Sequence, residues 1–277
     1  MIEIKNFSQF NEIVRNFRKL HNSTLTNCFM MPDEIQRLAD EGKLFIAEYP
    51  RWLIITCDRN DYRNFYYYTT ENSDITYVKK FIVESECGDL YVDIVSRSGR
   101  GDSVTPAKLV ESGIAEEYKS YKRMVIPLKE RDLSVLKKDL AESYSFHYDY
   151  CDKDAIHALW KTALDEKSTP LPDTQELKQF CENGNLITVL DSKGDLAGVA
   201  LVDISSKNTL IQHLSVSPDH RRKGLAMSIM SKGIELSGER NVYLWVDREN
   251  SSAIAIYDRL KFKDDGTICD QLYMKGN

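Results

Sequence analysis

The chain has 277 residues, of which 42% are hydrophobic and 29% are charged, as in most globular proteins. A net charge of −6 without a concentrated basic region argues against nucleic acid as a partner. No apolar run reaches the roughly 18–20 residues of a membrane span, so we expect no membrane partner. Residues 1–10 do not resemble a secretory signal, and the 6 cysteines form no Cys-x-x-Cys pair. We therefore expect isolated thiols, no metal site and a cytoplasmic protein.

At this length we expect about two domains. We predict a first domain at residues 1–128, a connecting segment at 129–143 and a second domain at 144–277. The connecting segment is rich in Lys, Asp and Glu, and its stretch 133–141, LSVLKKDLA, has a helical pattern.

In the first domain, residues 65–85 run from a strand through a polar turn into a helix. Glu71 and Asp74 precede this helix, and neither Gly nor Ala stands at its start, so its N-terminus should repel a phosphate. Residues 97–101 are better explained as a flexible loop than as a phosphate loop. Three tyrosines are interpreted as ordinary strand residues: Tyr66, Tyr67 and Tyr68. The alternative is that they and Trp245 line an amine pocket through cation–π contact.

The first part of the second domain alternates between predicted strands and predicted helices. A loop containing Pro170 and Pro172 separates two predicted helices, and a turn at 192–195 closes a hairpin. The predicted elements are a strand at about 144–151, a helix at about 153–164, a helix at 173–182, and paired strands at 185–191 and 196–204.

The most informative stretch is 209–235. Its apolar start, 209–216, predicts a buried strand, and apolar residues recur at helical spacing from Leu225 onward. Gly224 therefore stands where a strand gives way to a helix, whose first N–H groups are unpaired and attract anions. Gly224 and Ala226 allow a phosphate to approach the backbone. Three positively charged side chains accompany them: Arg221, Arg222 and Lys223. A solvated basic cap is the competing explanation.

A second block follows. Residues 241–247 predict another apolar strand, and a helix pattern then carries Asn250, Ala253 and Tyr257 ahead of Phe262. Together with Arg-x-x-Gly-x-Ala at 221–226, this order resembles the GNAT superfamily of acyl-CoA-dependent N-acyltransferases.

The sequence departs from that family at two positions. Lys261 stands where the family usually has glycine, and Trp245 stands where some relatives have a glutamate base. The first departure is compatible with a changed turn. The second departure leaves the identity of the general base undetermined.

The resemblance implies an α/β fold with two GNAT-like domains in tandem, each a mixed, mostly antiparallel sheet flanked by helices. It implies acetyl-CoA as cosubstrate without a metal, entering where strands 210–216 and 242–247 splay apart. Tyr257 is the implied general acid, with a helix packing role as the alternative. The implied cofactor-binding residues are Leu214, Val216, Arg221, Arg222, Lys223, Gly224, Leu225, Ala226 and Asn250.

Short similar segments in the two halves of the sequence also suggest the tandem arrangement. Residues 40–46 resemble 182–188, residues 90–93 resemble 244–247, and 108–114 resemble 256–262, in the same order. Leu109 falls where the second half has Tyr257, and an aliphatic side chain cannot donate a proton. We therefore predict that residues 1–128 are a degenerate copy without an acyl-CoA site.

The implied chemistry is transfer of an acetyl group from a thioester to an amine. Deprotonating an amine of pKa near 10.4 at pH 7 costs roughly 4–5 kcal/mol. A backbone N–H near Val216 would stabilise the oxyanion. Candidates for the base are His213, Asp203, Asp247 and water, and a structural role for His213 is the competing explanation.

We therefore predict an acetyl-CoA-dependent N-acetyltransferase. Its acceptor is a primary amine of a small molecule, an amino acid or a peptide. A non-catalytic acyl-CoA sensor or scaffold is the alternative, and an aminoacyl or peptidyl transferase is a third possibility. The pattern specifies neither the acceptor nor the oligomeric state.

Overall fold

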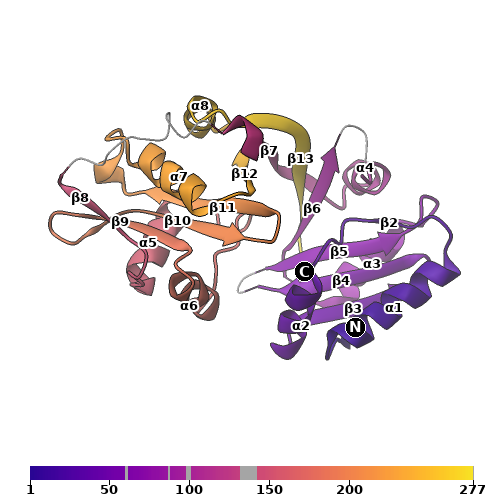
Figure 1. The fold of residues 1–277 in the computed structure, drawn as a ribbon. Helices are drawn as coiled ribbons and strands as arrows, with labels where there is room; N and C mark the ends of the chain where they lie inside the picture. Colours follow the sequence, from indigo (N-terminus) through magenta and orange to yellow (C-terminus); the bar gives the residue numbers. More distant parts are fainter. Residues whose placement is uncertain (60–61, 87, 98–100, 132–141, 277) are drawn as a thin grey trace. The chain divides into compact units, whose positions relative to one another are not determined.

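The computed structural model describes residues 1–59, 62–86, 88–97, 101–131 and 142–276. The chain forms two compact units (Figure 1). Unit 1 comprises Met1–Ser120 and Gly266–Asn277, and unit 2 comprises Tyr121–Asp265. Among the described residues, no helix combines the length and apolar character needed to cross a membrane.

Unit 1 is a sheet with helices on both faces. Its helices are α1 (Phe7–Leu20), α2 (Pro32–Asp40), α3 (Thr76–Ser85) and α4 (Val104–Glu111). Its strands are β1 (Ile2–Glu3), β2 (Leu25–Thr26), β3 (Leu44–Tyr49), β4 (Trp52–Asp58), β5 (Arg63–Thr69), β6 (Leu90–Arg97) and most of β13 (Lys263–Met274). The strands lie in the order β1-β3-β4-β5-β6-β13, with β2 beside β5. Among the described strand pairs of unit 1, only β5 and β6 are parallel.

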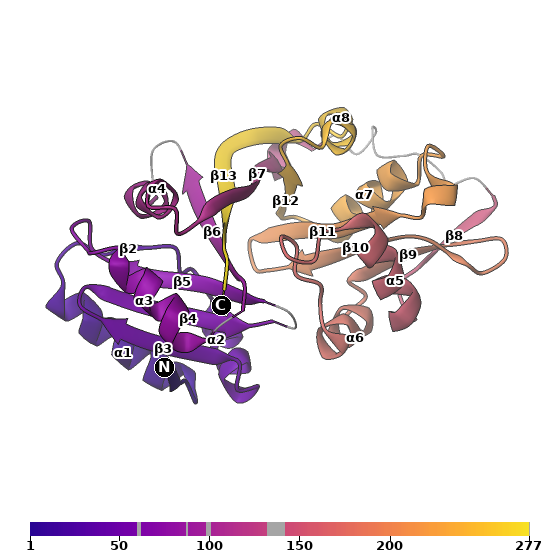
Figure 2. The same ribbon diagram turned by 180° about the vertical axis from the view of Figure 1, so that it is seen from behind.

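Alternation along β4 builds the two cores of unit 1. Leu53 and Ile55 pack in a cluster with α1 and α2, whereas Trp52 and Ile54 pack in a cluster with α3 and α4. Because successive strand side chains point to opposite faces, the apolar run at the start of β4 supplies both clusters. Figures 1 and 2 show these helix pairs on opposite faces of the sheet.

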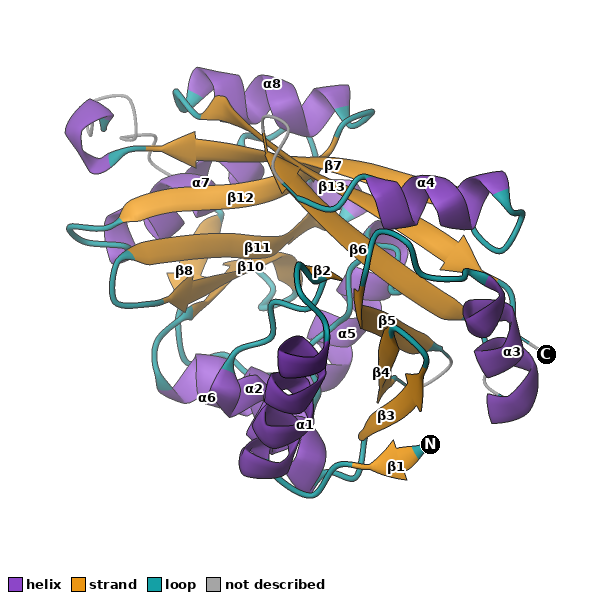
Figure 3. Ribbon diagram, turned by 90° about the vertical axis from the view of Figure 1, so that its right-hand side faces the viewer, coloured by secondary structure: helices purple, strands orange, loops and turns teal. Residues whose placement is uncertain are grey.

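Unit 2 repeats this arrangement. Its helices are α5 (Lys153–Ala163), α6 (Thr174–Glu182), α7 (Leu225–Leu236) and α8 (Ser251–Arg259), with short 3-10 turns at Leu128–Glu130 and Pro218–His220. Its strands are most of β7 (Glu116–Ile126), then β8 (Tyr144–His147), β9 (Leu186–Asp191), β10 (Leu196–Ile204), β11 (Asn208–Val216) and β12 (Asn241–Asp247). They lie in the order β7-β12-β11-β10-β9-β8 (Figure 3). In the part of unit 2 that the structure describes, only β11 and β12 pair in parallel.

The predicted elements of the second domain are confirmed with small shifts, except that β8 ends at His147 rather than near residue 151. Ile187 and Val189 of β9 pack in a cluster with α7, whereas Leu186 packs in a cluster with α5 and α6. The element order of unit 1 therefore recurs in unit 2, and the predicted tandem fold is present.

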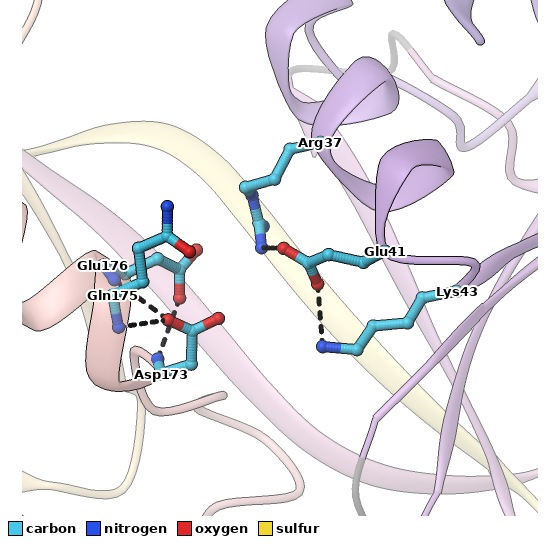
Figure 4. Close-up of polar contacts among 6 residues, drawn as sticks. All are labelled: Arg37, Glu41, Lys43, Asp173, Gln175 and Glu176. Atoms are coloured by element: carbon cyan, nitrogen blue, oxygen red, sulfur yellow. Dashed lines mark hydrogen bonds and ion pairs between the residues drawn. The ribbon is translucent and has the colours of Figure 1, made fainter. Parts of the chain in front are cut away.

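Two sets of polar contacts stabilise helix ends (Figure 4). Asp173 Oδ1 accepts a hydrogen bond from the Glu176 backbone N–H at 2.9 Å, and Glu176 Oε2 accepts one from the Asp173 N–H at 2.9 Å. This reciprocal capping box fixes the start of α6. In unit 1, Glu41 pairs with Arg37 at 3.1 Å and with Lys43 at 2.7 Å just after α2 ends.

The last strand of each repeat completes the sheet of the other unit. In unit 1, β13 pairs antiparallel with β6 from Thr267↔Arg97 to Met274↔Leu90. In unit 2, β7 pairs antiparallel with β12 from Val242↔Ile126 to Asp247↔Tyr121. The units thus have bounds other than those of the predicted domains. Most of the connecting segment, including its helical stretch 133–141, and residues 98–100 lie outside the described residues.

Candidate functional site

The strands β11 and β12 separate along their length. Their parallel pairing covers Asn208↔Asn241, Thr209↔Val242 and Leu210↔Tyr243 and ends there, although both strands continue. Backbone N–H and C=O groups along an opened strand edge can bind an extended ligand chain. The predicted opening between 210–216 and 242–247 is therefore present in unit 2.

A β-bulge lies on β11 beside this opening. His213 has φ 56°, and the pairing between β10 and β11 shifts register between Val199 and Leu201. The indole Nε1–H of Trp160 donates to the His213 carbonyl oxygen at 2.8 Å. A bulge redirects the strand and its side chains, and this hydrogen bond from α5 holds it in place.

The start of α7 lies where the sequence predicted it. Gly224 is the N-cap residue with φ 87°, and no side chain caps the helix. Arg221, Arg222 and Lys223 are exposed, and Arg221 Nε donates to the Val216 carbonyl oxygen at 3.2 Å. The helix start therefore lacks a side-chain cap among the described residues, and three exposed cations precede it in the chain, a combination that favours an anion.

The other predicted cofactor-binding residues occupy mixed positions. Leu225 is buried in the α7 cluster, so only its backbone is available to a ligand, and Ala226 is half-buried. Leu214 and Val216 are half-buried against the same cluster. Asn250 caps α8, because its Oδ1 accepts from the Ala253 backbone N–H at 3.0 Å.

Tyr257 lies on α8 with its side chain buried in the α7 cluster. Its ring centroid is 6.0 Å from that of Phe262, and burial raises its pKa to about 12. The phenol is therefore protonated at neutral pH and is able to donate a proton. Lys261 has φ 67°, a conformation that favours the glycine usual in the family.

His213 is the base candidate with a free acceptor. Its Nε2 lies 3.0 Å from the carbonyl oxygen of Pro170, which only accepts, so Nε2 carries the hydrogen. Nδ1 is then an acceptor, and it is buried without a hydrogen-bond partner among the described residues. Burial lowers the pKa of His213, although the bond to Pro170 opposes this. The imidazole is therefore neutral at pH 7.

The other base candidates have different surroundings. Asp247 Oδ1 accepts from the Glu249 backbone N–H at 2.9 Å and so serves the turn after β12. Desolvation raises the pKa of Asp203 on β10. Trp245 was considered for an amine pocket. The Arg123 guanidinium carbon lies 5.9 Å from the centroid of its ring, so a cation of the protein itself occupies that position.

Sequence reasoning missed Trp160 and Pro170 as neighbours of this site. Both contact His213, from 53 and 43 residues away along the chain. The sequence around a tryptophan on the apolar face of a helix does not indicate which distant carbonyl oxygen its indole N–H will bind. Only the packing of α5 against the sheet brings the indole to the bulge.

Comparison with known proteins finds relatives of the second half of the chain and of the fold. Residues 153–262 match the model of the Acetyltransferase (GNAT) family. Mycothiol acetyltransferase of Clavibacter sepedonicus is 28% identical over 95 residues, which are 33% of this chain and 31% of that protein. Spermidine N(1)-acetyltransferase of Escherichia coli K12 is 32% identical over 94 residues, which are 32% of this chain and 50% of that protein. The chain thus spans half or less of the length of these relatives.

Comparison with solved structures shows which fold the whole chain resembles. A tandem GNAT protein from the clavulanic acid biosynthesis pathway superposes with a TM-score of 0.58 at 14% identity, covering 82% of this chain and 79% of that chain. Unit 2 therefore carries a GNAT-family domain, and the chain as a whole has a tandem GNAT fold.

Proposed function

We propose that this protein is an acetyl-CoA-dependent N-acetyltransferase whose only cofactor site lies in unit 2. The observation that carries the proposal is the uncapped start of α7, with Gly224 at positive φ and three exposed cations, beside the opening of β11 and β12. The pyrophosphate of acetyl-CoA would accept hydrogen bonds from the first N–H groups of α7. The pantetheine chain would lie along the free edge of β11.

The reaction we propose is direct attack by a neutral amine on the thioester carbonyl carbon. The carbon–nitrogen bond forms, and negative charge develops on the carbonyl oxygen. A backbone N–H of β11 between the bulge and Val216 would stabilise that charge. The carbon–sulfur bond then breaks, and the Tyr257 hydroxyl protonates the leaving thiolate.

We propose His213 as the group that accepts the amine proton. Its Nδ1 has no hydrogen-bond partner among the described residues, and burial lowers its pKa below the ordinary value, which favours the neutral imidazole. Asp247 is less suited because its carboxylate serves a turn. The Pro170 carbonyl and the Trp160 ring, whose centroid lies 5.3 Å from that of His213, would fix the imidazole.

The acceptor we propose is a primary amine of a small molecule, amino acid or peptide. The similar enzymes carry the names of a polyamine and of mycothiol. A useful panel of acceptors therefore contains a polyamine, an amino sugar, free amino acids and short peptides.

The test is release of free thiol from acetyl-CoA in the presence of each amine, with binding of acetyl-CoA measured separately by calorimetry. We expect one binding site per chain and amine-dependent thiol release with at least one class of acceptor. Binding without release for every amine would favour the sensor alternative. Absence of binding would refute both.

A further inference from the structure

A guanidinium of unit 2 lies over the aromatic side chains of β12. The Arg123 Cζ atom is 5.7 Å from the ring centroid of Tyr243 and 5.9 Å from that of Trp245. Both rings are within the roughly 6 Å at which a ring face attracts a cation. Arg123 stands opposite Trp245 in the pairing of β7 with β12, so its side chain extends from β7 over β12.

One carboxylate fixes the orientation of this guanidinium. Arg123 Nε and Nη2 donate to Asp265 Oδ2 at 3.1 and 2.6 Å. No hydrogen bond from Arg123 Nη1 is present among the described residues, and 28% of the Arg123 side chain is exposed. The guanidinium is therefore held by two rings and one carboxylate, and it still has a nitrogen that can donate to a ligand.

This guanidinium lies beside the opening of β11 and β12. The pairing of these strands ends at Tyr243, so Trp245 belongs to the part of β12 whose edge towards β11 is open. The residues that alternate with Tyr243 and Trp245 pack in the α7 cluster, so these two rings face the other side of the sheet. The His213 ring is on that side as well, because it contacts Trp160 of α5. Arg123 and His213 therefore flank the opening on one face of the sheet.

We propose that Arg123 binds a carboxylate of the acceptor, so that the preferred acceptor is an amine with a carboxylate several bonds away from its nitrogen. The proposal rests on the acetyltransferase function proposed above. Guanidinium N–H groups form charge-assisted hydrogen bonds with carboxylates, and a guanidinium already held in one orientation loses little freedom on binding. Neighbouring strands lie about 4.8 Å apart, so an acceptor with its amine in the opening and its carboxylate over β12 needs a spacing of roughly 5–8 Å.

Asp203 favours the opposite charge and so defines the competing class of acceptor. It lies on β10 two residues beyond Leu201, which packs in the cluster of α5 and α6, so Asp203 is on the same face as Tyr243. Burial raises the pKa of Tyr243, and Asp203 raises it further, whereas Arg123 lowers it. An acceptor with a second ammonium group would be attracted by Asp203 and repelled by Arg123. The charge at the far end of the acceptor therefore distinguishes the two classes.

Three amines of equal length test this charge preference: 5-aminopentanoate, 5-aminopentanol and 1,5-diaminopentane. Thiol release from acetyl-CoA by the full chain gives kcat/KM for each amine. We expect the value for the carboxylate to exceed that for the alcohol by about 10- to 100-fold, the effect of one charge-assisted hydrogen bond, and the diamine to be poorest. Equal values for the carboxylate and the alcohol, or a preference for the diamine, would overturn the proposal and leave the acetyltransferase function standing.

Variants of two arginines assign the preference to its residue. Arg123→Gln should bring the ratio of carboxylate to alcohol down to about one, whereas Arg123→Lys should keep part of it, because lysine retains the charge without the planar fork. Arg63→Gln is the matched control in unit 1, since the Arg63 Cζ atom lies 5.8 Å from the Phe45 ring centroid and Nε lies 2.5 Å from Asp58 Oδ1. It should keep the ratio of the parent. A ratio unchanged in Arg123→Gln would contradict the proposal.

Tryptophan fluorescence measures binding without catalysis. Trp52 and Trp160 are buried, whereas Trp245 is half-buried beside Arg123. Titration with 5-aminopentanoate, with and without coenzyme A, should change the emission of the parent more than 5-aminopentanol does, and Trp245→Phe should lose the change.

The two readouts separate the two proposals. Carboxylate-selective binding without thiol release from any amine would refute the acetyltransferase function and support the carboxylate site. Thiol release without any preference for the carboxylate would do the reverse, and absence of both signals would refute both. The ranking of the three amines by the unaltered chain decides this even where a variant fails to fold.

Discussion

The starts of α3 and α7 are equivalent positions in the two units, and they differ in what they can bind. At α3, Asp74 Oδ1 accepts a hydrogen bond from the Thr76 backbone N–H at 2.9 Å, which lowers the pKa of the carboxyl. The N-cap residues themselves are Ile75 in α3 and Gly224 in α7, and neither helix has a side-chain cap among the described residues. The residue before the N-cap is Asp74 in unit 1 and Lys223 in unit 2, so the charge next to the helix start opposes a phosphate at α3 and favours one at α7.

The openings between the parallel strands differ in the same way. In unit 1 the parallel pairing of β5 and β6 covers two residue pairs. Beyond it, the buried Asn27 amide donates to the Phe65 and Asp93 carbonyl oxygens at 3.2 Å each and accepts from the Tyr67 N–H at 2.8 Å. Asn27 therefore bridges the two strands from within unit 1. Unit 1 thus differs from unit 2 at both positions, and the absence of a ligand site in unit 1 stays a prediction.

The two units share a fold but differ at the positions where unit 2 has its candidate site. Both units keep the parallel strand pair, the helices on each face and a buried core. The capacity to bind an anion depends on the few residues at a helix start and at a strand opening. The predictions below test those residues, from the largest expected effect to the smallest.

The largest effect is expected for Gly224→Asp, which gives α7 the kind of carboxylate that α3 already has. Acetyl-CoA binding should fall below detection in calorimetry, because a fixed negative charge would oppose the pyrophosphate. Gly224→Asn is the matched control, since it has a similar size and tolerates positive φ but carries no charge. Equal loss in both variants would assign the effect to backbone strain instead.

Tyr257→Phe should lower kcat by about 10²–10⁴-fold, the range for loss of a general acid. The acetyl-CoA Kd should stay nearly unchanged, because the ring and its packing are kept. The measurement is kcat of the folded variant beside its Kd. Turnover within a few-fold of the parent would remove Tyr257 from the reaction and leave it a core residue.

His213→Gln should lower kcat by about 10²-fold or more if Nδ1 accepts the amine proton. Glutamine keeps a donor for the Pro170 carbonyl but has no basic nitrogen. A few-fold change in kcat accompanied by a lower Tm would make His213 a structural residue only.

The same variant tests the pH dependence of stability. Because burial places the folded pKa of His213 below the ordinary 6.5, the unfolded chain binds more protons just below that pH. The contribution of a neutral His213 to stability is therefore present above about pH 6.5 and is lost as pH falls. The difference in Tm between pH 7.5 and pH 5.5 should shrink in His213→Gln.

Asn27→Ala should destabilise unit 1 without changing turnover per folded molecule. It removes hydrogen bonds at three buried backbone groups, at a cost of about 2–4 kcal/mol. Denaturant unfolding measures this cost, and Asn11→Ala on the exposed face of α1 is the control. A large fall in kcat of folded protein would mean that unit 1 takes part in catalysis through this position.

Trp160→Phe should lower kcat/KM by about fivefold, equivalent to the roughly 1 kcal/mol of one hydrogen bond. It removes the donor that holds the His213 carbonyl. Trp52 in unit 1 is a close match, since it is also buried and donates from Nε1 to a backbone oxygen, that of Asp74, at 2.9 Å. Trp52→Phe should cost similar stability and leave kcat/KM unchanged.

The sequence by itself determined the features that are local along the chain. Strand, turn and helix follow one another within 209–235, so the position of Gly224 at a helix start was predictable from periodicity and turn residues. The carboxylate beside the start of α3 was predictable for the same reason, because Asp74 and the helix it precedes are neighbours in the chain. The tandem repeat also followed from spacing alone.

Only the tertiary structure decided the features that join distant residues. The exchange of β7 and β13 between the sheets, the Trp160 bond to the bulge and the Asn27 bridge each link positions more than 30 residues apart. Such pairs cannot be predicted from sequence periodicity. Each residue fits the pattern of its own helix or strand, whichever distant residue it contacts. The packing of helices against the sheets selects them, through burial of apolar faces and pairing of buried polar groups.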